Sequence, residues 1–118
     1  MHPVATMPPT PPPNESLAEL AAVLGDDNVR TLVRTYLREF PLSLQQLGGG
    51  DRPTRHRLAH SMKSNSRLVG ALALSQRMAA LELRLAEAQG PDVTPEDLTA
   101  IAADFEAAVV PLRAFVAA

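Results

Sequence analysis

The sequence contains no cysteine and no tryptophan, and aromatic residues make up only 3% of its 118 residues. Without cysteine the chain has no disulfide framework, no cysteine-based zinc site and no thiol nucleophile, and it suits a reducing compartment. No stretch approaches the roughly 18 apolar residues of a membrane span, and the N-terminus lacks the charged start and apolar run of a secretion signal. We therefore expect a cytoplasmic location without membrane contact.

An excess of charge of one sign is also absent, since the formal net charge is −2. This balance gives no electrostatic footprint for nucleic acid or an anionic membrane, so neither partner is expected. Alanine and leucine dominate the composition, which favours closely packed helices over a sandwich of β-branched strands. The length is enough for one domain with one modest core. These features predict an all-α fold.

Proline is concentrated at the N-terminus, where residues 1–13 hold six of the eleven prolines. Proline cannot continue a helix or donate to a β-ladder, so we interpret residues 1–13 as a disordered or extended tail. The folded domain is expected to comprise residues 14–118.

Apolar residues recur at spacings of three and four in the rest of the chain, and no segment alternates with a period of two. The pattern predicts a short helix over residues 15–24, then longer helices over 28–47, 52–69, 71–89 and from 95 onwards. The expected cap residues are Asn14, Asp26 or Asp27, Asp51 and Thr94. In the last helix, the residues expected to face inward are Leu98, Ile101, Phe105, Val109, Leu112 and Val116. Short loops between such helices predict an antiparallel four-helix bundle with an additional short N-terminal helix.

The helix over residues 52–69 has a histidine at its middle. At about 100° per residue its buried face contains Leu58, Met62 and Val69, with Ala59 and Ser66 at the edge. His60 lies on the opposite face, and the side chains that share this face are His56, Lys63, Ser64 and Arg67. That face of the helix carries no carboxylate.

Two other interpretations of this histidine need weighing. A lone exposed histidine is more often a solvated surface residue than a site, because function needs convergent groups. His56 and His60 are four residues apart, a spacing at which a histidine pair can bind zinc or nickel. A metal site would need a third ligand, and the helix face offers no cysteine, aspartate or glutamate. We therefore expect no metal.

The residues around His60 extend into a longer pattern, which reads Ala59-His60-Ser61-Met62-Lys63-Ser64, then Gly70-Ala71, Leu74 and Leu81-Glu82. This pattern resembles the signature of histidine-containing phosphotransfer (HPt) domains of two-component phosphorelay systems. The length, the five-helix layout and the Arg-Glu-Phe segment of the preceding helix also fit. The resemblance covers about residues 15–117.

The resemblance implies that His60 accepts a phosphoryl group from a receiver-domain aspartate and passes it to another receiver as a phosphohistidine. Lys63 would stabilise the phosphoryl charge, with Arg67 as a second cation and Gly70 as structural support. Most members have glycine where this chain has Ser64, so we expect slower or more selective transfer. The chain has no Gly-rich phosphate loop and no acidic cluster expected near His60, so it would be a carrier and not an enzyme. No cofactor is expected, and magnesium would belong to the receiver.

The expected partners are response-regulator receiver domains, with a hybrid histidine kinase as a further candidate. The partner surface should include His56, Arg57 and Leu68, with Leu72 close to Leu68. We expect a monomer. The alternative function is a non-phosphorylated adaptor that keeps the bundle and docks receiver domains or partner helices, and Ser64 is the sequence feature that favours it.

Overall fold

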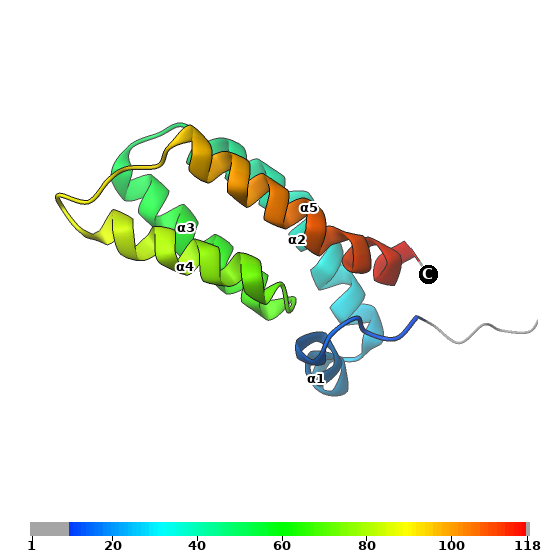
Figure 1. Ribbon diagram of the computed structural model, residues 1–118. Coiled ribbons are helices and arrows are strands. Elements are labelled where there is room, and N and C mark those ends of the chain that lie inside the picture. The colour runs from blue at the N-terminus through cyan, green and yellow to red at the C-terminus, as the bar shows by residue number, and fades with distance from the viewer. Residues whose placement is uncertain (1–9, 118) are drawn as a thin grey trace, which may run out of the picture.

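The computed structural model describes residues 10–117, and within them it contains five helices and no strand (Figure 1). Helices α2, α3, α4 and α5 form an antiparallel bundle in which each packs against the next and α5 returns to α2. The short helix α1 packs on α2 and α3 at one end. This arrangement confirms the predicted all-α class. The bounds are α1 Glu15–Leu24, α2 Asp26–Leu47, α3 Arg52–Leu68, α4 Leu72–Ala86 and α5 Pro95–Ala117.

The core contains the apolar stripes of all five helices. Its largest fully buried side chains include Leu17, Leu47, Met62, Leu74, Met78, Ile101, Leu112 and Phe115. At the end of α5, Val116 is half-buried and packs against the core as predicted, and Phe115, which was not predicted to face inward, is fully buried. The guanidinium of Arg30 lies 4.3 Å above the Phe115 ring and also donates to the Phe115 carbonyl.

Arg30 is a buried cation that ties together distant parts of the chain. Only 5% of the residue is exposed, and its Nε pairs with Asp26 at 2.6 Å. Its Nη2 donates to the Thr10 carbonyl at 2.9 Å, so the last residues of the expected tail contact the domain. The rest of that tail, residues 1–9, lies outside the described residues, and the domain boundary at residue 14 stays a prediction.

Several helix ends agree with the predicted caps. Asn14 caps α1, Asp51 caps α3, and Thr94 exchanges two hydrogen bonds with Asp97 at the start of α5. Such side chains satisfy backbone N–H groups that have no partner in the first turn of a helix.

Two predicted ends were wrong. The N-terminal cap residue of α2 is Gly25, and Asp26 and Asp27 lie in its first turn, where Asp26 binds Arg30 instead. Helix α4 ends at Ala86 and not near Gln89. Its last carbonyls accept hydrogen bonds from the Arg52 guanidinium of α3, which holds the end of α4 in place.

The corner between α3 and α4 depends on Gly70, which has a φ of +81°. Its N–H donates to the Arg67 carbonyl while the next residue, Ala71, donates to Ser66, a pattern typical of a glycine helix stop. Asn14 closes this corner from outside. Its Nδ2 donates to the Val69 carbonyl at 2.9 Å, while its Oδ1 caps α1.

None of the helices in the part of the chain that the structure describes is long and apolar enough to cross a membrane.

Candidate functional site

Helix α3 presents His60 to solvent near the middle of the bundle. The imidazole side chain is 59% exposed. The opposite face of α3 is buried through Ala59, Met62 and Ser66. The predicted edge positions Ala59 and Ser66 are therefore fully inside, whereas Leu58 is only half-buried. The exposed position of His60 is confirmed.

One carboxylate from α4, which the sequence interpretation did not place at this site, contacts His60. Glu82 Oε2 lies 2.6 Å from His60 Nδ1, and Glu82 Oε1 lies 2.5 Å from Lys63 Nζ. The helix face of α3 itself carries no carboxylate, as predicted, but the neighbouring helix supplies one. Among residues 10–117, no hydrogen bond engages His60 Nε2.

Glu82 is held in its charged form by these contacts. The hydrogen bond from Lys63 lowers the pKa of the Glu82 carboxyl below its usual value; partial burial opposes this, and the bond with His60 adds to it. An ionised carboxylate can only accept hydrogen bonds, so His60 Nδ1 is the donor in this pair. The side chain of Glu82 is only 17% exposed, whereas that of His60 is 59% exposed.

Close packing of α3 on α4 brings these groups together. Ala59 and Ser66 give α3 a narrow buried face, and Ser75 of α4 donates to the Lys63 carbonyl at 3.0 Å. Ser66 also bonds the hydroxyl of Tyr36 at 2.8 Å, which links α3 to α2. Burial raises the pKa of Tyr36 to about 12, so this hydroxyl stays protonated. The helix that carries His60 is thereby fixed from two sides.

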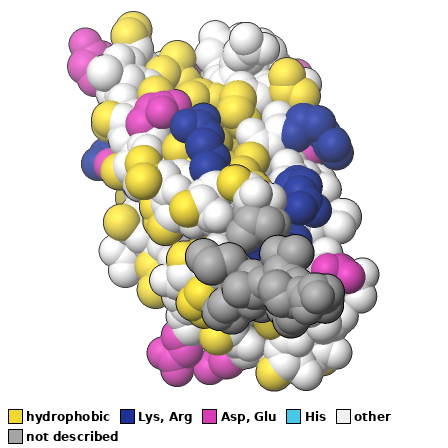
Figure 2. Space-filling model, turned by 90° about the vertical axis from the view of Figure 1, so that its right-hand side faces the viewer, with side chains coloured by type: hydrophobic (Ala, Val, Ile, Leu, Met, Phe, Trp, Pro, Cys, Tyr) yellow, Lys and Arg dark blue, Asp and Glu magenta, His cyan; other side chains and the backbone are white. Residues whose placement is uncertain are grey.

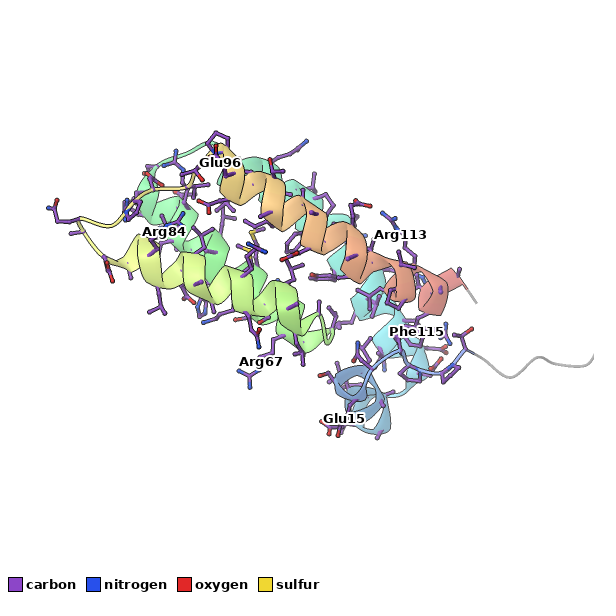
Figure 3. All side chains as sticks on the ribbon, in the orientation of Figure 1. Glu15, Arg67, Arg84, Glu96, Arg113 and Phe115 are labelled. Atoms are coloured by element: carbon purple, nitrogen blue, oxygen red, sulfur yellow. The ribbon has the colours of Figure 1, made fainter. Side chains whose placement is uncertain are left out.

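The other residues predicted for this face fall into two groups. Ser64 and Arg67 are exposed and line shallow hollows between α3 and the start of α4. Arg67 projects away from the bundle (Figure 3), and no ion pair engages it in residues 10–117. Arg57 is exposed and reaches Thr54, while His56 is half-buried and does not take part in the Glu82 contacts.

A metal site at His56 and His60 gains no support. Although Glu82 supplies a carboxylate that the sequence interpretation lacked, it bonds His60 and Lys63. In the described residues, no group of three or more histidine, cysteine, aspartate or glutamate side chains could hold a metal ion.

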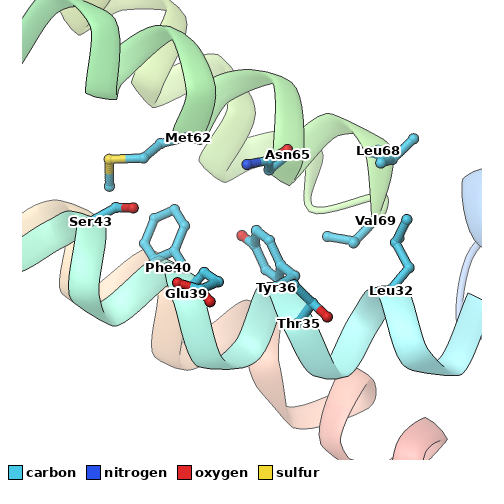
Figure 4. Close-up of a pocket in the computed structure, with 10 residues that line it drawn as sticks. All are labelled: Leu32, Thr35, Tyr36, Glu39, Phe40, Ser43, Met62, Asn65, Leu68 and Val69. Carbon is cyan, nitrogen blue, oxygen red and sulfur yellow. The ribbon is translucent and has the colours of Figure 1, made fainter.

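Apolar surface lies beside the histidine face. Leu68 is 43% exposed and Leu72 is 54% exposed, on either side of the Gly70 corner. Leu68 also borders a groove of about 260 Å³ between α2 and α3 (Figure 4). Tyr36, Phe40 and Val69 line this groove, with Glu39 and Asn65 among its polar residues. The groove lies on one flank of the exposed face of α3.

The end of the bundle near α1 and the end of α5 has a different surface. Acidic, basic and apolar side chains are mixed there, and no histidine among the described residues is visible (Figure 2).

Sequence reasoning missed the contacts of Glu82, although Leu81-Glu82 belonged to the pattern around His60. Its position one residue after the buried Leu81 could have indicated the edge of the α3–α4 interface. The pairing with Lys63 could not be predicted, because it depends on how α4 lies against α3.

Comparison with known protein families gives a match to the Hpt domain over residues 15–110. Neither curated proteins nor solved structures give a match. The family match begins at the first residue of α1 and includes most of α5, so all five helices contribute to it. It covers most of the chain, and the chain belongs to the Hpt domain family.

Proposed function

We propose that this chain is a phosphorelay intermediate that accepts a phosphoryl group on His60 from the aspartate of one receiver domain and passes it to another. Hpt domains are phosphoryl carriers of phosphorelays, so the family supports the general activity. The observation that carries the assignment to His60 is its position. This histidine is 59% exposed on the bundle, and Lys63 lies one helical turn away.

The chemistry of imidazole suits a carrier. With an ordinary pKa of about 6.5, histidine is largely neutral and nucleophilic near pH 7. The N–P bond that it forms remains reactive enough to be broken by the next acceptor. A surface histidine can be reached by the acyl phosphate of a docked receiver, whereas a core histidine cannot.

Two cations support a phosphoryl group at this place. Lys63 is 31% exposed, and Arg67 continues the same face one turn further along α3. Two unit charges about 4 Å apart attract by roughly 1 kcal/mol in water and by about 4 kcal/mol at the effective dielectric of a protein surface. Docking of a receiver would exclude water and strengthen these contacts.

We propose that the receiver docks on the face formed by His56, Arg57 and Leu68, with Leu72 at its edge. Leu68, about two helical turns after His60 on α3, and Leu72 beyond the Gly70 corner offer exposed apolar surface, and the arginines offer charge. A receiver of a hybrid histidine kinase could be the donor. We expect the chain to act as a monomer in the cytoplasm.

The test is transfer from a receiver whose aspartate carries labelled phosphate. The chain should take up label that is acid-labile and alkali-stable, as expected of phosphohistidine, and a second receiver should remove it. A folded chain that takes no label from any of several receivers would contradict the proposal.

The alternative is an adaptor that docks receivers without being phosphorylated. Ser64 favours it, because a side chain stands where most members have glycine, and this exposed position faces any incoming partner. Docking without transfer in the same experiment would support the adaptor.

Replacing Ser64 by glycine should speed phosphoryl uptake, because it widens access to the His60 ring. It should also lower the free energy of unfolding by about 0.5 kcal/mol, since glycine is a poorer helix former than serine. Transfer kinetics and denaturant unfolding measure the two effects. A Ser64→Gly chain that transfers no faster and docks no tighter would contradict the interpretation that the Ser64 side chain limits access to His60.

Reversing the charge of Arg67 should weaken receiver docking about fivefold to tenfold at low salt, a loss of about 1 to 1.4 kcal/mol. The effect should shrink at high salt, because exposed charges are screened within about 10 Å at 0.1 M. Binding of the receiver is measured at two ionic strengths for Arg67→Glu and Arg57→Glu. Arg113→Glu is the matched control, since Arg113 is exposed on α5, away from Arg67 (Figure 3). Equal losses at both salt concentrations would contradict the electrostatic account.

A further inference from the structure

Helix α4 carries an exposed stripe beside the helix that bears His60. Leu83 is 71% exposed and Leu72 is 54% exposed. Positions 72, 76, 79 and 83 recur at spacings of four, three and four, so their side chains project from one side of α4. We call this set, which consists of Leu72, Gln76, Ala79 and Leu83, the α4 stripe. Three of its four side chains are apolar, where the solvent face of an amphipathic helix normally carries polar or charged residues.

The α4 stripe follows the seam between α3 and α4 past the histidine. Its first three residues line the hollow of about 630 Å³ between the two helices, opposite Lys63, Ser64 and Arg67. Leu83 lies one turn beyond Ala79 and directly follows Glu82, whose carboxylate is 2.6 Å from His60 Nδ1. The most exposed leucine of α4 is therefore next to the residue that contacts His60.

The hollow combines apolar surface from α4 with positive charge from α3. No carboxylate lines it. Lys63 pairs with Glu82, whereas Arg67 takes part in no ion pair of residues 10–117 and projects away from the bundle (Figure 3). A partner that fits this seam presents an apolar side chain to the α4 stripe and a carboxylate to Arg67.

The size of a protein interface places the α4 stripe under a partner that reaches His60. Specific interfaces bury about 800 Å² on each partner, which corresponds to a patch about 30 Å across. Neighbouring helices pack about 8 to 10 Å apart. The stripe extends from residue 72 to residue 83, about 16 Å along α4. A domain centred on the histidine therefore covers α3 and reaches the helix on its flank.

We propose that the receiver docks across the seam of α3 and α4 as well as on the face around Leu68, with Leu83 as its apolar contact on α4 and Arg67 as the group that binds a receiver carboxylate. This inference rests on the proposed function, because it names a surface that the same partner covers. It places His60 inside the interface and not at its edge. A histidine covered on both flanks is shielded from water, which protects the acyl phosphate from hydrolysis during transfer.

Exposure of a leucine does not by itself indicate a binding surface, because much of any protein surface is apolar. Val110 of α5 provides the comparison. It is 66% exposed, and within the described residues its helix packs against α2 and α4 but not against α3. Val110 therefore has the exposure of Leu83 without its position beside His60.

The binding experiment compares the full wild-type chain with Leu83→Ala, Leu83→Gln and the control Val110→Ala. The Kd for a receiver should rise on the order of tenfold in Leu83→Ala, because the truncated side chain buries less apolar area. Leu83→Gln should lose at least as much, since it keeps a long side chain but buries a polar amide. Val110→Ala should bind like wild type. Circular dichroism melts of all the variants should match wild type, because both positions are exposed.

Transfer kinetics distinguish loss of docking from loss of folding. With a receiver that carries labelled phosphate, the receiver concentration that gives half the maximal rate should rise on the order of tenfold in Leu83→Ala. The maximal rate should change less, because Leu83 contacts the partner and not the reacting atoms. A variant that had partly unfolded would instead lose active protein at every receiver concentration.

Methyl NMR locates the surface directly. Addition of unlabelled receiver to a chain labelled in its leucine and valine methyl groups should shift the signals of Leu72 and Leu83. The signals of Val110 should stay in place.

The two proposals fail in different ways. If wild type binds no receiver and takes up no label, the proposed function fails and this surface fails with it. If wild type binds and is labelled, but Leu83→Ala binds equally well and the Leu83 methyl signals do not shift, only the α4 surface is overturned. A dimer of the wild-type chain that Leu83→Gln dissociates would assign the stripe to a second copy and would also overturn it.

Discussion

Replacing His60 by glutamine should abolish phosphoryl uptake, leaving label no higher than that of a chain without receiver. An amide nitrogen has no free lone pair for attack on phosphorus, because the pair is delocalised into the carbonyl. The side chain is 59% exposed, so the free energy of unfolding should change by only about 0.5 kcal/mol or less. Labelling with a phosphorylated receiver and a circular dichroism melt measure the two quantities on the same protein.

His56→Gln is the informative comparison for this result. It removes the other histidine of α3 but keeps the acceptor and the Glu82 contact. The variant should reach the same final level of label as wild type, whatever its rate of docking. Label that persists in His60→Gln and disappears in His56→Gln would move the acceptor one turn along the helix.

The features predicted correctly from the sequence are those that local chemistry determines. Asn14 and Asp51 act as caps because a short polar side chain before an apolar stripe satisfies the first N–H groups of a helix. The apolar periodicity likewise predicted the buried residues Ile101, Phe105, Val109 and Leu112 of α5. His60 could be placed on an exposed face because helix geometry puts it opposite Met62, which is 2% exposed.

The features that were missed all depend on contacts between elements. Phe115 packs in the core, and Arg30, 85 residues earlier in the chain, covers its ring and binds its carbonyl. Helix α4 stops at Ala86 where Arg52 of α3 binds its carbonyls. Glu82 reaches His60 because α4 packs closely on α3. Periodicity within one helix contains no information about the neighbour that a polar side chain will meet.

The difference between local sequence patterns and contacts between helices matters most around His60. The sequence pattern pointed to His60 and Lys63, but it gave Lys63 no partner within the chain. The structure places Lys63 in an ion pair with Glu82. Arg67, for which no ion pair is found in residues 10–117, therefore becomes the better candidate for attracting a receiver from a distance.

Replacing Gly70 by alanine should lower the free energy of unfolding by about 2 to 3 kcal/mol. The left-handed backbone at φ +81° costs an L-residue about 1 to 2 kcal/mol. A Cβ here would also lie 2.2 Å from Cγ and Oδ1 of Asn14, so that side chain must move. Movement of Asn14 breaks the cap of α1 and the bond to the Val69 carbonyl, each about 1 kcal/mol. The lower entropy of unfolded alanine offsets part of this loss.

Gly49→Ala is the matched control, because its φ is not positive and a Cβ would meet nothing within 4 Å. Denaturant unfolding should find it within about 0.5 kcal/mol of wild type. The decisive measurement is the double variant with Asn14→Ala. Once the Asn14 side chain is absent, Gly70→Ala has no cap to displace. The free energy of unfolding lost in the double variant should therefore be about 1 to 2 kcal/mol smaller than the sum of the losses in the two single variants. Full additivity would mean that the cost at Gly70 comes from its backbone alone and that Asn14 does not close the corner through side-chain contact.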